Sequence, residues 1–571
     1  MKGISIQKII YTTLVLIAVF STTLLYPAGK IALVYSSQTE KNLKGGEWVG
    51  KEFTDTELLL LNNRYNYSVI DDTSVDDKLD NSFDLVIVLN AKYLSDEALD
   101  SIEKHLNRGG SLLFNWAFAY FDEDGDERED TVLSKKFDLK IESEISKDSY
   151  SYFHTIRGDT PLSFNVPGGF RLKIRTGRNP LSVRANSNRV QSLGYWRSEY
   201  ELTTGYTPFN KFTGFVYGQE DKSKFVWFGF DTNSVIKTNP YKKIFETLML
   251  NSIDWLLGKT KSEVTAWPSN KKAAVVFSCD VDNADANLNS IIGIFDSKKI
   301  KCQFFLSHAP AKKEVVDKLS LHDIGIFTNL NKGFKGQSYD LLYSKFQDIK
   351  QNIETVFNKK VFTLKSVRWD YDDNTIKVMR KLGLTTLIGD ENKDRSVPEF
   401  IFEKILGIPK TGLSFDEILS AQKNTDAGTI AEAMLMDFER VYEENGLYVF
   451  NFDSDSFNNP NSLKVMESVI DKLSDKDIWI TTFDEVYDWW SKKENIAVNL
   501  YKSKENSFEI QIENKNKIGV NNVSVMLSNI VNAQSTIDNK NVFTFFRGAT
   551  NDLFLNIIKL EPGETAYLKL K

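Results

Sequence analysis

The sequence predicts a multidomain α/β protein with a doubly wound domain, an irregular (β/α) barrel and a small all-β sandwich at its C-terminal end. Three observations lead to this prediction. The chain has 571 residues, enough for roughly three or four domains of about 150 residues each. Apolar strand-like runs alternate with helical stretches up to residue 492, an order typical of parallel sheets covered by helices. Beyond that point polar and apolar residues alternate and the helical period disappears.

Composition excludes several classes of protein. Hydrophobic residues make up 41% and aromatic residues 12% of the chain, which excludes an intrinsically disordered protein. The net charge of -7 gives no electrostatic basis for nucleic-acid binding. Two Cys exclude a disulfide framework and an all-cysteine zinc site. Any imidazole ligand must come from the four His of the chain: His105, His154, His308 and His322.

The N-terminal residues 1–29 have the pattern of an export segment. Lys2 and Lys8 precede an apolar run from Ile9 to Tyr26, and small residues follow it. This pattern is typical of a signal peptide, and the run is also long enough for an uncleaved signal anchor. Both alternatives predict an extracytoplasmic protein that is secreted or anchored to the membrane. No Cys follows the run, so a bacterial lipid anchor is excluded.

Residues 30–260 predict a doubly wound domain of the flavodoxin-like kind. Strands are expected at Lys30–Ser36, Leu85–Asn90, Ser111–Trp116 and Phe225–Asp231, with helices between them and a closing helix at Tyr241–Leu257. Fully apolar strands of this type are buried on both faces of a parallel sheet. Residues 143–210 are irregular and strand-rich, and we interpret them as an insertion.

The order of these elements resembles the class I glutamine amidotransferase-like fold, including the domain of that type in β-galactosidases. The segment Gly109–Glu129 is most similar to that family. The resemblance implies a nucleophilic Cys at the turn after the third strand, but this turn reads Asn90-Ala91-Lys92-Tyr93 and the domain has no Cys. Glutaminase chemistry is therefore excluded. The acidic run Asp122–Asp130 does not fit a calcium-loop pattern and is interpreted as a solvated loop.

Residues 261–492 alternate strand and helix about seven times, which predicts a (β/α) barrel. Functional groups in such barrels lie where strands end, and Asp280, Arg368 and Asp453 all fall at expected strand ends. Cys279 and Cys302 are expected on neighbouring strands as buried free thiols rather than as a disulfide. Trp489 and Trp490 end an amphipathic helix, where packing is the simpler role.

These residues, in their order, resemble the polysaccharide deacetylase family (NodB homology, carbohydrate esterase 4). The similarity covers about 220 residues and rests on four motifs: Asp280-Val281-Asp282, His322–Gly325, Arg368–Tyr371 and Gly446–Asp453. It implies that Asp280 is the general base, Asp282 the metal-binding carboxylate and Arg368 the residue that orients the base. Asp453 stands where the family has a proton-donating His.

The sequence departs from this family at the metal site. The family's H-x-x-x-H pair falls at Phe327 and Asn331, neither of which is His. Because zinc prefers imidazole, we expect the standard zinc site to be absent and the chain to use no cofactor. Zinc or another divalent cation on Asp282 is expected only if the chain is an active, divergent enzyme. His322 is expected to be structural, and His308 lies near a strand end without a His partner.

The same resemblance suggests a carbohydrate-binding surface and a role for Arg368. We expect Asp280, Asp282, Asn331, Trp369 and Tyr371 to contact substrate, and Arg368 to be the counter-ion of the two aspartates. In residues 493–571, polar and apolar residues alternate in five short segments. This pattern predicts an immunoglobulin-like β module that carries no catalytic residues.

Three functions remain open. The first is an extracytoplasmic deacetylase-like protein that binds or acts on an envelope polysaccharide or exopolysaccharide and is catalytically impaired, a pseudoenzyme. The alternative is an active divergent metal-dependent carbohydrate N- or O-deacetylase, a hydrolase of non-peptide C–N bonds. The third is a structural cell-surface protein without a sugar groove. The expected partners are a cell-surface polysaccharide and envelope proteins, with no nucleic acid.

Overall fold

The structure is a computed structural model. It describes residues 29–570 apart from 129–131, 146–151, 176, 186, 188, 199–210, 282–287, 329, 331–332, 391–393, 422–425, 503–506, 531–541, 548–549 and 551. The predicted export segment lies outside the described residues except for Gly29. Among the helices that are described, none combines the length and the apolar character needed to cross a bilayer.

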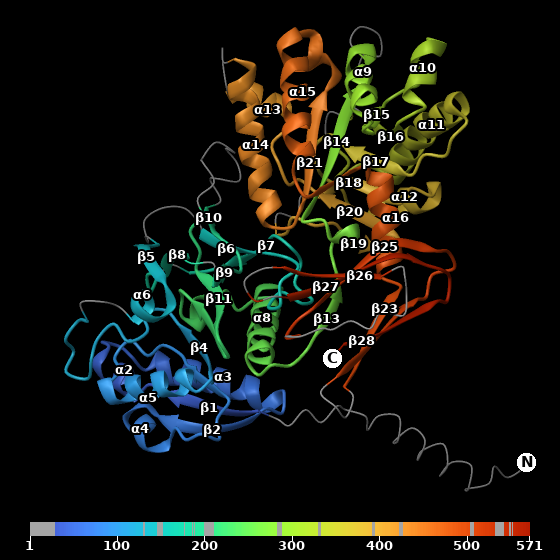
Figure 1. Cartoon of the computed structure of the whole chain (residues 1–571). Coiled ribbons are helices and arrows are strands. Elements are labelled where there is room, and N and C mark those ends of the chain that lie inside the picture. Colours follow the sequence, from blue (N-terminus) through green and yellow to red (C-terminus); the bar gives the residue numbers. More distant parts are fainter. Residues whose placement is uncertain are drawn as a thin grey trace, which may run out of the picture.

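The first domain is built on a seven-stranded sheet (blue to green in Figure 1). Its first five strands are parallel to their neighbours and its last two are antiparallel. The parallel part has the 2-1-3-4-5 strand order of one common doubly wound fold. In spatial order the strands are β2 (Asn66–Asp71), β1 (Lys30–Tyr35), β3 (Leu85–Val88), β4 (Ser111–Asn115), β12 (Ser223–Phe228), β11 (Phe215–Glu220) and β9 (Val190–Ser192).

Alternate residues of each central strand pack into two different cores. Ile31 and Leu33 of β1 join a core with helices α3 (Trp48–Asn62) and α8 (Tyr241–Leu256). The intervening Ala32 and Val34 join a second core with helix α5 (Asp96–Asn107). The sheet is therefore covered by helices on both faces, as the apolar strands predict. The similarity to amidotransferases stays a prediction.

The turn after β3 is held by a polar network. Asn90 is buried with a positive φ of 60°, a conformation that favours Asn among non-glycine residues. Its side chain donates to Glu52 at 2.6 Å, and its backbone N–H donates to Asn115 at 2.6 Å. An amide thus occupies the position where the amidotransferase resemblance implies a thiol.

The predicted insertion at 143–210 contributes to two small sheets beside the main one, and its strand β9 joins the main sheet. One pairs β5 (Leu139–Glu144) with β8 (Leu181–Ala185). The other has the order β10 (Trp196–Ser198), β6 (Tyr152–Ile156) and β7 (Phe170–Lys173).

The second domain is an α/β unit with a curled, half-barrel sheet. All its strands run parallel except the edge strand β19. The spatial order is β19 (Glu399–Phe402), β20 (Ile405–Pro409), β18 (Thr386–Asp390), β17 (Thr363–Ser366), β16 (Asp323–Thr328), β15 (Gln303–Leu306), β14 (Ala273–Val281) and β21 (Leu447–Asp453), and β22 (Ile478–Thr481) also pairs with β14.

The curled sheet has an inner and an outer core. Along β14, Ala274 and Val276 belong to the inner core, whereas Val275 and Phe277 belong to the outer core with the surrounding helices. The main outer helices are α9 (Leu288–Lys298), α11 (Tyr339–Phe357), α12 (Asp373–Leu382), α14 (Ala427–Glu443) and α15 (Pro460–Ser474), whereas Phe483 and Val486 of α16 (Phe483–Lys493) pack in the inner core. This two-sided burial requires the near-continuous apolar strands seen in the sequence.

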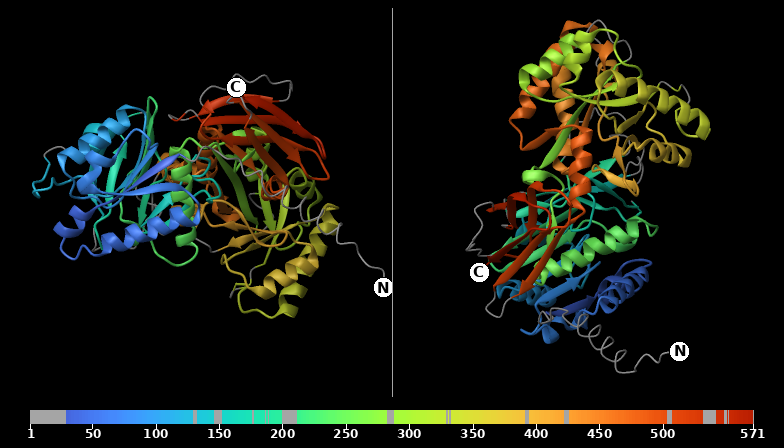
Figure 2. Two further views of the ribbon diagram at one scale, coloured as in Figure 1. Left: turned by 90° about the horizontal axis from the view of Figure 1, so that it is seen from below. Right: turned by 90° about the vertical axis from the view of Figure 1, so that its right-hand side faces the viewer.

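The C-terminal module (red in Figure 2) has two antiparallel sheets that share one apolar core. One sheet contains β23 (Ile496–Lys502), β24 (Phe508–Asn514) and β28 (Thr565–Leu570). The other contains β13 (Ser262–Val264), β25 (Val520–Leu527), β27 (Asp552–Leu560) and β26 (Val542–Arg547). Strand β13 lies in the range predicted for the barrel but pairs with the C-terminal module. The immunoglobulin-like topology stays a prediction.

Two of the four His are structural groups of the first domain. His154 is fully buried and accepts a hydrogen bond from the Gly214 backbone N–H at 3.0 Å. His105 is equally buried and lies 3.0 Å from the Ser111 carbonyl oxygen. Burial lowers the pKa of His154 to about 3 and that of His105 to about 4. Both rings are therefore neutral in the folded protein at neutral pH.

This neutrality predicts acid-sensitive stability. The pKa of His154 is lower in the folded than in the unfolded protein. The unfolding free energy that the neutral ring supports therefore decreases as pH falls below about 6.5. Between pH 7 and pH 5, the wild type should lose about 2 kcal/mol more unfolding free energy than His154→Gln. Urea unfolding followed by circular dichroism measures this difference. The exposed His308 provides the control: His308→Gln should follow the wild type, and a His154→Gln profile parallel to the wild type would contradict the assignment.

Candidate functional site

Strands β14 and β21 bring together the polar residues expected at the mouth of the barrel. The two strands are parallel and place Asp280 opposite Asp453. Ala274 and Val276 face the inner core, and side chains alternate along a strand, so Ser278 and Asp280 face the same interior. Asn451 and Asp453 follow on β21 in the same way. The mouth thus has two carboxylates, an amide and a hydroxyl.

Lys365 on β17 places a buried ammonium among these groups. Only 2% of its side chain is exposed, and its Nζ lies 2.6 Å from Asp280 Oδ1. The ammonium also donates to Asn451 Oδ1 and, at 3.3 Å, to Ser278 Oγ. Its three protons therefore have three oxygen partners, which is the condition under which a buried charge is tolerated.

Arg368 does not form the ion pair with Asp280 that was predicted for it, and its catalytic role stays a prediction. Its side chain is exposed, and the ion pair with Asp280 is formed by Lys365 instead. The physical reason is that β17 ends at Ser366. Lys365 is still part of the strand and its side chain points to the inside of the barrel, whereas Arg368 lies in the turn after the strand. The expectation of Arg368 as counter-ion was wrong.

The turn after β17 positions Trp369. Trp369 has a positive φ of 56° and is half-buried beside the mouth. Asp370 stabilises this turn, since its carboxylate accepts from Ser366 Oγ at 2.8 Å and from the Phe334 backbone N–H at 3.0 Å. Tyr371, by contrast, packs against the outer core and is not among the residues that line the mouth.

A cavity of about 210 Å³ opens at this mouth. Its wall combines Asp280, Asp453 and Asn451 with Trp369, and its rim includes the ion pair of Lys410 and Glu417 at 2.8 Å. An aromatic ring beside several hydrogen-bonding groups is typical of sites that bind polar ligands with apolar faces.

The described residues do not fit the zinc site that the family resemblance implies. Phe327 is 3% exposed in the inner core and offers no ligand atom. Asp282 and Asn331 lie outside the described residues. The Lys365 ammonium pairs directly with Asp280, and it repels a cation 4 Å away by about 4 kcal/mol per unit charge at a dielectric constant typical of protein surfaces. Within the described ranges, no three His, Cys, Asp or Glu side chains form a group able to hold a metal ion.

The remaining predicted residues of the barrel have structural surroundings. His322 is buried, its Nδ1 accepts from the Cys302 backbone N–H at 3.2 Å, and burial lowers its pKa. Cys279 and Cys302 are free and buried, as predicted, and burial raises the pKa of both thiols. Trp489 donates to the Ala266 carbonyl at 2.8 Å, which agrees with a packing role. The described part of the acidic run, 122–128, folds back on Asp122, which accepts from the Asp126 backbone N–H at 2.8 Å.

Comparisons with known proteins give distant structural similarity. No family model matches the chain, and no curated protein matches it. A Mycobacterium smegmatis protein described as a polysaccharide deacetylase is 13% identical, with a TM-score of 0.35 over 41% of this chain and 94% of the other. A carbohydrate esterase 4 family pseudoenzyme from Bacillus anthracis is 14% identical, with a TM-score of 0.28 over 38% of this chain and 66% of the other.

A cold-adapted β-galactosidase from Rahnella sp. R3 is also similar, at 12% identity and a TM-score of 0.29 over 40% of this chain and 31% of the other. Since one fold supports many reactions, these similarities assign no reaction to this chain.

The Lys365–Asp280 pair makes a direct prediction about stability. Lys365→Met should lower the unfolding free energy at pH 7 by about 3 kcal/mol, because it leaves the Asp280 carboxylate largely buried without its cation. The deficit should shrink as pH falls, since protonation removes the uncompensated charge. Urea titrations at several pH values measure this. The double variant Lys365→Met/Asp280→Leu should regain most of the loss, and purely additive losses would contradict the pairing.

Proposed function

We propose that the mouth of the barrel binds carbohydrate without a divalent metal, in a deacetylase-like protein that acts outside the cytoplasm as a receptor or scaffold for an envelope polysaccharide. The observation that carries this proposal is the Lys365 ammonium bound to Asp280. In the family, the resembling carboxylate is the general base of a metal-dependent hydrolysis. Here its partner is the Lys365 ammonium, in place of the Arg368 that the resemblance implies.

The cavity at the mouth supports a sugar ligand. Asp280 and Asp453 offer acceptors to hydroxyl groups, and the amide N–H of Asn451 offers a donor, since Asn451 Oδ1 already accepts from Lys365 and Ser278. Trp369 offers a ring to the C–H face of a pyranose. Hydrogen bonding and ring contact give affinity without polarising a carbonyl, so binding does not require the chemistry that the missing His residues would supply.

The presence of Asp280 without a metal has a structural explanation under this proposal. Asp280 is needed to neutralise Lys365, and Lys365 connects β17 to β14 and, through Asn451, to β21. A barrel that has lost its metal site would be destabilised by unpaired carboxylates at this mouth. The ammonium removes that cost, and it favours the binding role over the alternative of an active metal-dependent deacetylase.

Binding of N-acetylglucosamine tetramer to the full extracytoplasmic chain, measured by isothermal titration calorimetry, tests this proposal. Trp369→Ala should weaken binding by about tenfold, since an aromatic contact contributes about 0.5–1.5 kcal/mol beyond its buried area. Arg368→Ala is the matched control, because Arg368 is exposed one residue away and does not line the cavity. It should change the affinity less than twofold.

The same samples distinguish binding from hydrolysis. Binding should be unchanged by EDTA, and no acetate should be released from the tetramer. Acetate release that requires a divalent metal and is lost in Asp280→Ala would contradict the proposal and support the divergent deacetylase. Equal affinities of the wild type and Trp369→Ala would also contradict it.

A further inference from the structure

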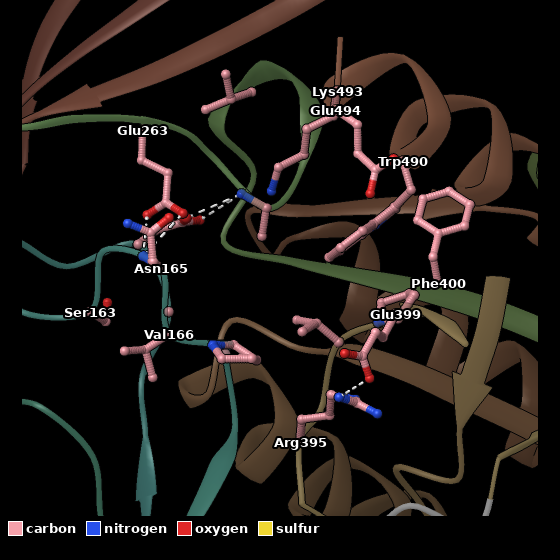
Figure 3. Close-up of a pocket in the computed structure, with 18 residues that line it drawn as sticks. Ser163, Asn165, Val166, Glu263, Arg395, Glu399, Phe400, Trp490, Lys493 and Glu494 are labelled. Carbon is pink, nitrogen blue, oxygen red and sulfur yellow. Dashed lines mark hydrogen bonds and ion pairs between the residues drawn. The ribbon is translucent and has the colours of Figure 1, made fainter. Parts of the chain in front are cut away.

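A second cavity, of about 250 Å³, lies where the domains meet (Figure 3). The loop Gly158–Gly168 of the first domain forms one wall, and residues 263–266 of the connection to the barrel form another. The segment 395–400 of the barrel and the last turn of α16 complete it. This cavity lies on the N-terminal side of β14, whereas Asp280 lies near its C-terminal end, and the nine residues of β14 span roughly 30 Å. It is therefore separate from the mouth.

Two oppositely charged side chains face this cavity without pairing. Lys493 points into the space between Glu263 and Trp490 in Figure 3, and its Nζ lies 4.8 Å from the centre of the Trp490 ring. Glu263 accepts only long hydrogen bonds, at 3.3 and 3.4 Å, from the Asn165 backbone N–H. In the part of the chain that the structure describes, neither side chain forms an ion pair.

The surroundings make both groups suited to a neutral hydrogen-bonding ligand. Burial raises the pKa of Glu263 to about 7, and burial lowers the pKa of Lys493. Both shifts favour the uncharged forms, because a buried charge without a close partner is costly. A hydroxyl group can accept from Lys493 and donate to Glu263 in the same site, which is the property that a polyol offers.

The rest of the lining fits one sugar-sized ring. Trp490 and Phe400 supply aromatic rings, and Val264 and Pro398 supply apolar contact. Arg395 is already paired with Glu399, so it does not provide a free cation for an anionic ligand. The volume is below the 300–1,000 Å³ typical of sites for drug-sized molecules, which limits the ligand to a small ring.

We propose that this junction cavity is a binding site for a single neutral monosaccharide, held between Glu263 and Lys493 against Trp490 and Phe400. Because its walls come from the first domain, the connecting segment and the barrel, an occupied site links these parts and stabilises their arrangement. This proposal does not depend on the function of the barrel mouth.

Saturation-transfer NMR with glucose and with N-acetylglucosamine, on the full extracytoplasmic chain, tests the site. Saturation should pass from the protein to the ring protons of at least one of the two sugars, and Glu263→Gln/Lys493→Met should weaken its binding by at least about tenfold. Lys492→Met is the matched control, because Lys492 is the next residue and pairs with Asp488 outside this cavity. All variants are compared in the Trp369→Ala background, which weakens binding at the mouth, and the signal from the junction cavity should remain in that background.

Several outcomes would overturn the proposal. They are no transfer to either sugar, equal binding by the Glu263→Gln/Lys493→Met and Lys492→Met variants, or loss of the signal in Trp369→Ala. Competition by glycine or by acetate in place of the sugars would identify a zwitterion or anion site and would also overturn it. Circular dichroism of each variant verifies that a lost signal does not reflect unfolding.

Discussion

The buried ion pair between Lys365 and Asp280 sets what the barrel mouth is able to do. A lysine almost without exposed surface is stable only if each donor has an acceptor, and here the acceptors come from β14 and β21. The ammonium therefore fixes the side chains of Ser278, Asp280 and Asn451 around itself. It also places an ammonium group beside Asp280 at the mouth. The proposed sugar binding by hydrogen bonds and ring contact is compatible with this ion pair.

The same inward alternation that brings Lys365 to the mouth organises the rest of the barrel. Residues of even number on β14 pack inside or end at the mouth, and residues of odd number pack under the outer helices. The inner core continues to Trp267, which is fully buried, and from there the chain leads back to β13 and the C-terminal module. The module in turn contacts the end of α8, where Asn529 donates to the Trp255 carbonyl at 3.1 Å. The junction cavity lies near these contacts, between the first domain, the connecting segment and the barrel.

Much of the fold could be predicted from the sequence because its strands are apolar on both faces. The runs at Lys30–Ser36 and Leu85–Asn90 predict buried parallel strands, and the structure places them side by side. The positions of Asp280 and Asp453 at strand ends also follow from the alternation of strands and helices, and the structure shows that the two strands are neighbours. The buried thiols of Cys279 and Cys302 follow from their place in apolar strands.

The rest depended on contacts between distant segments, which no local pattern encodes. Lys365 was missed because one lysine in a short strand has the same pattern as a solvent-exposed position, and only the register of β17 within the sheet brings it to Asp280. One feature could have indicated that Lys365 is buried. It lies between Leu364 and Ser366 in a short strand whose other residues are all buried. The pairing of β13 with β25 joins segments about 260 residues apart and could not be read from sequence.

Zinc binding to the purified protein, followed by equilibrium dialysis and elemental analysis, tests the central claim most directly. If the barrel mouth works without a divalent metal, as proposed, the wild type should retain no stoichiometric zinc and should give the same zinc content as Asp280→Asn and Asp282→Asn. One zinc ion per chain that is lost in either of these variants would show that the barrel mouth holds a metal, and it would contradict the account.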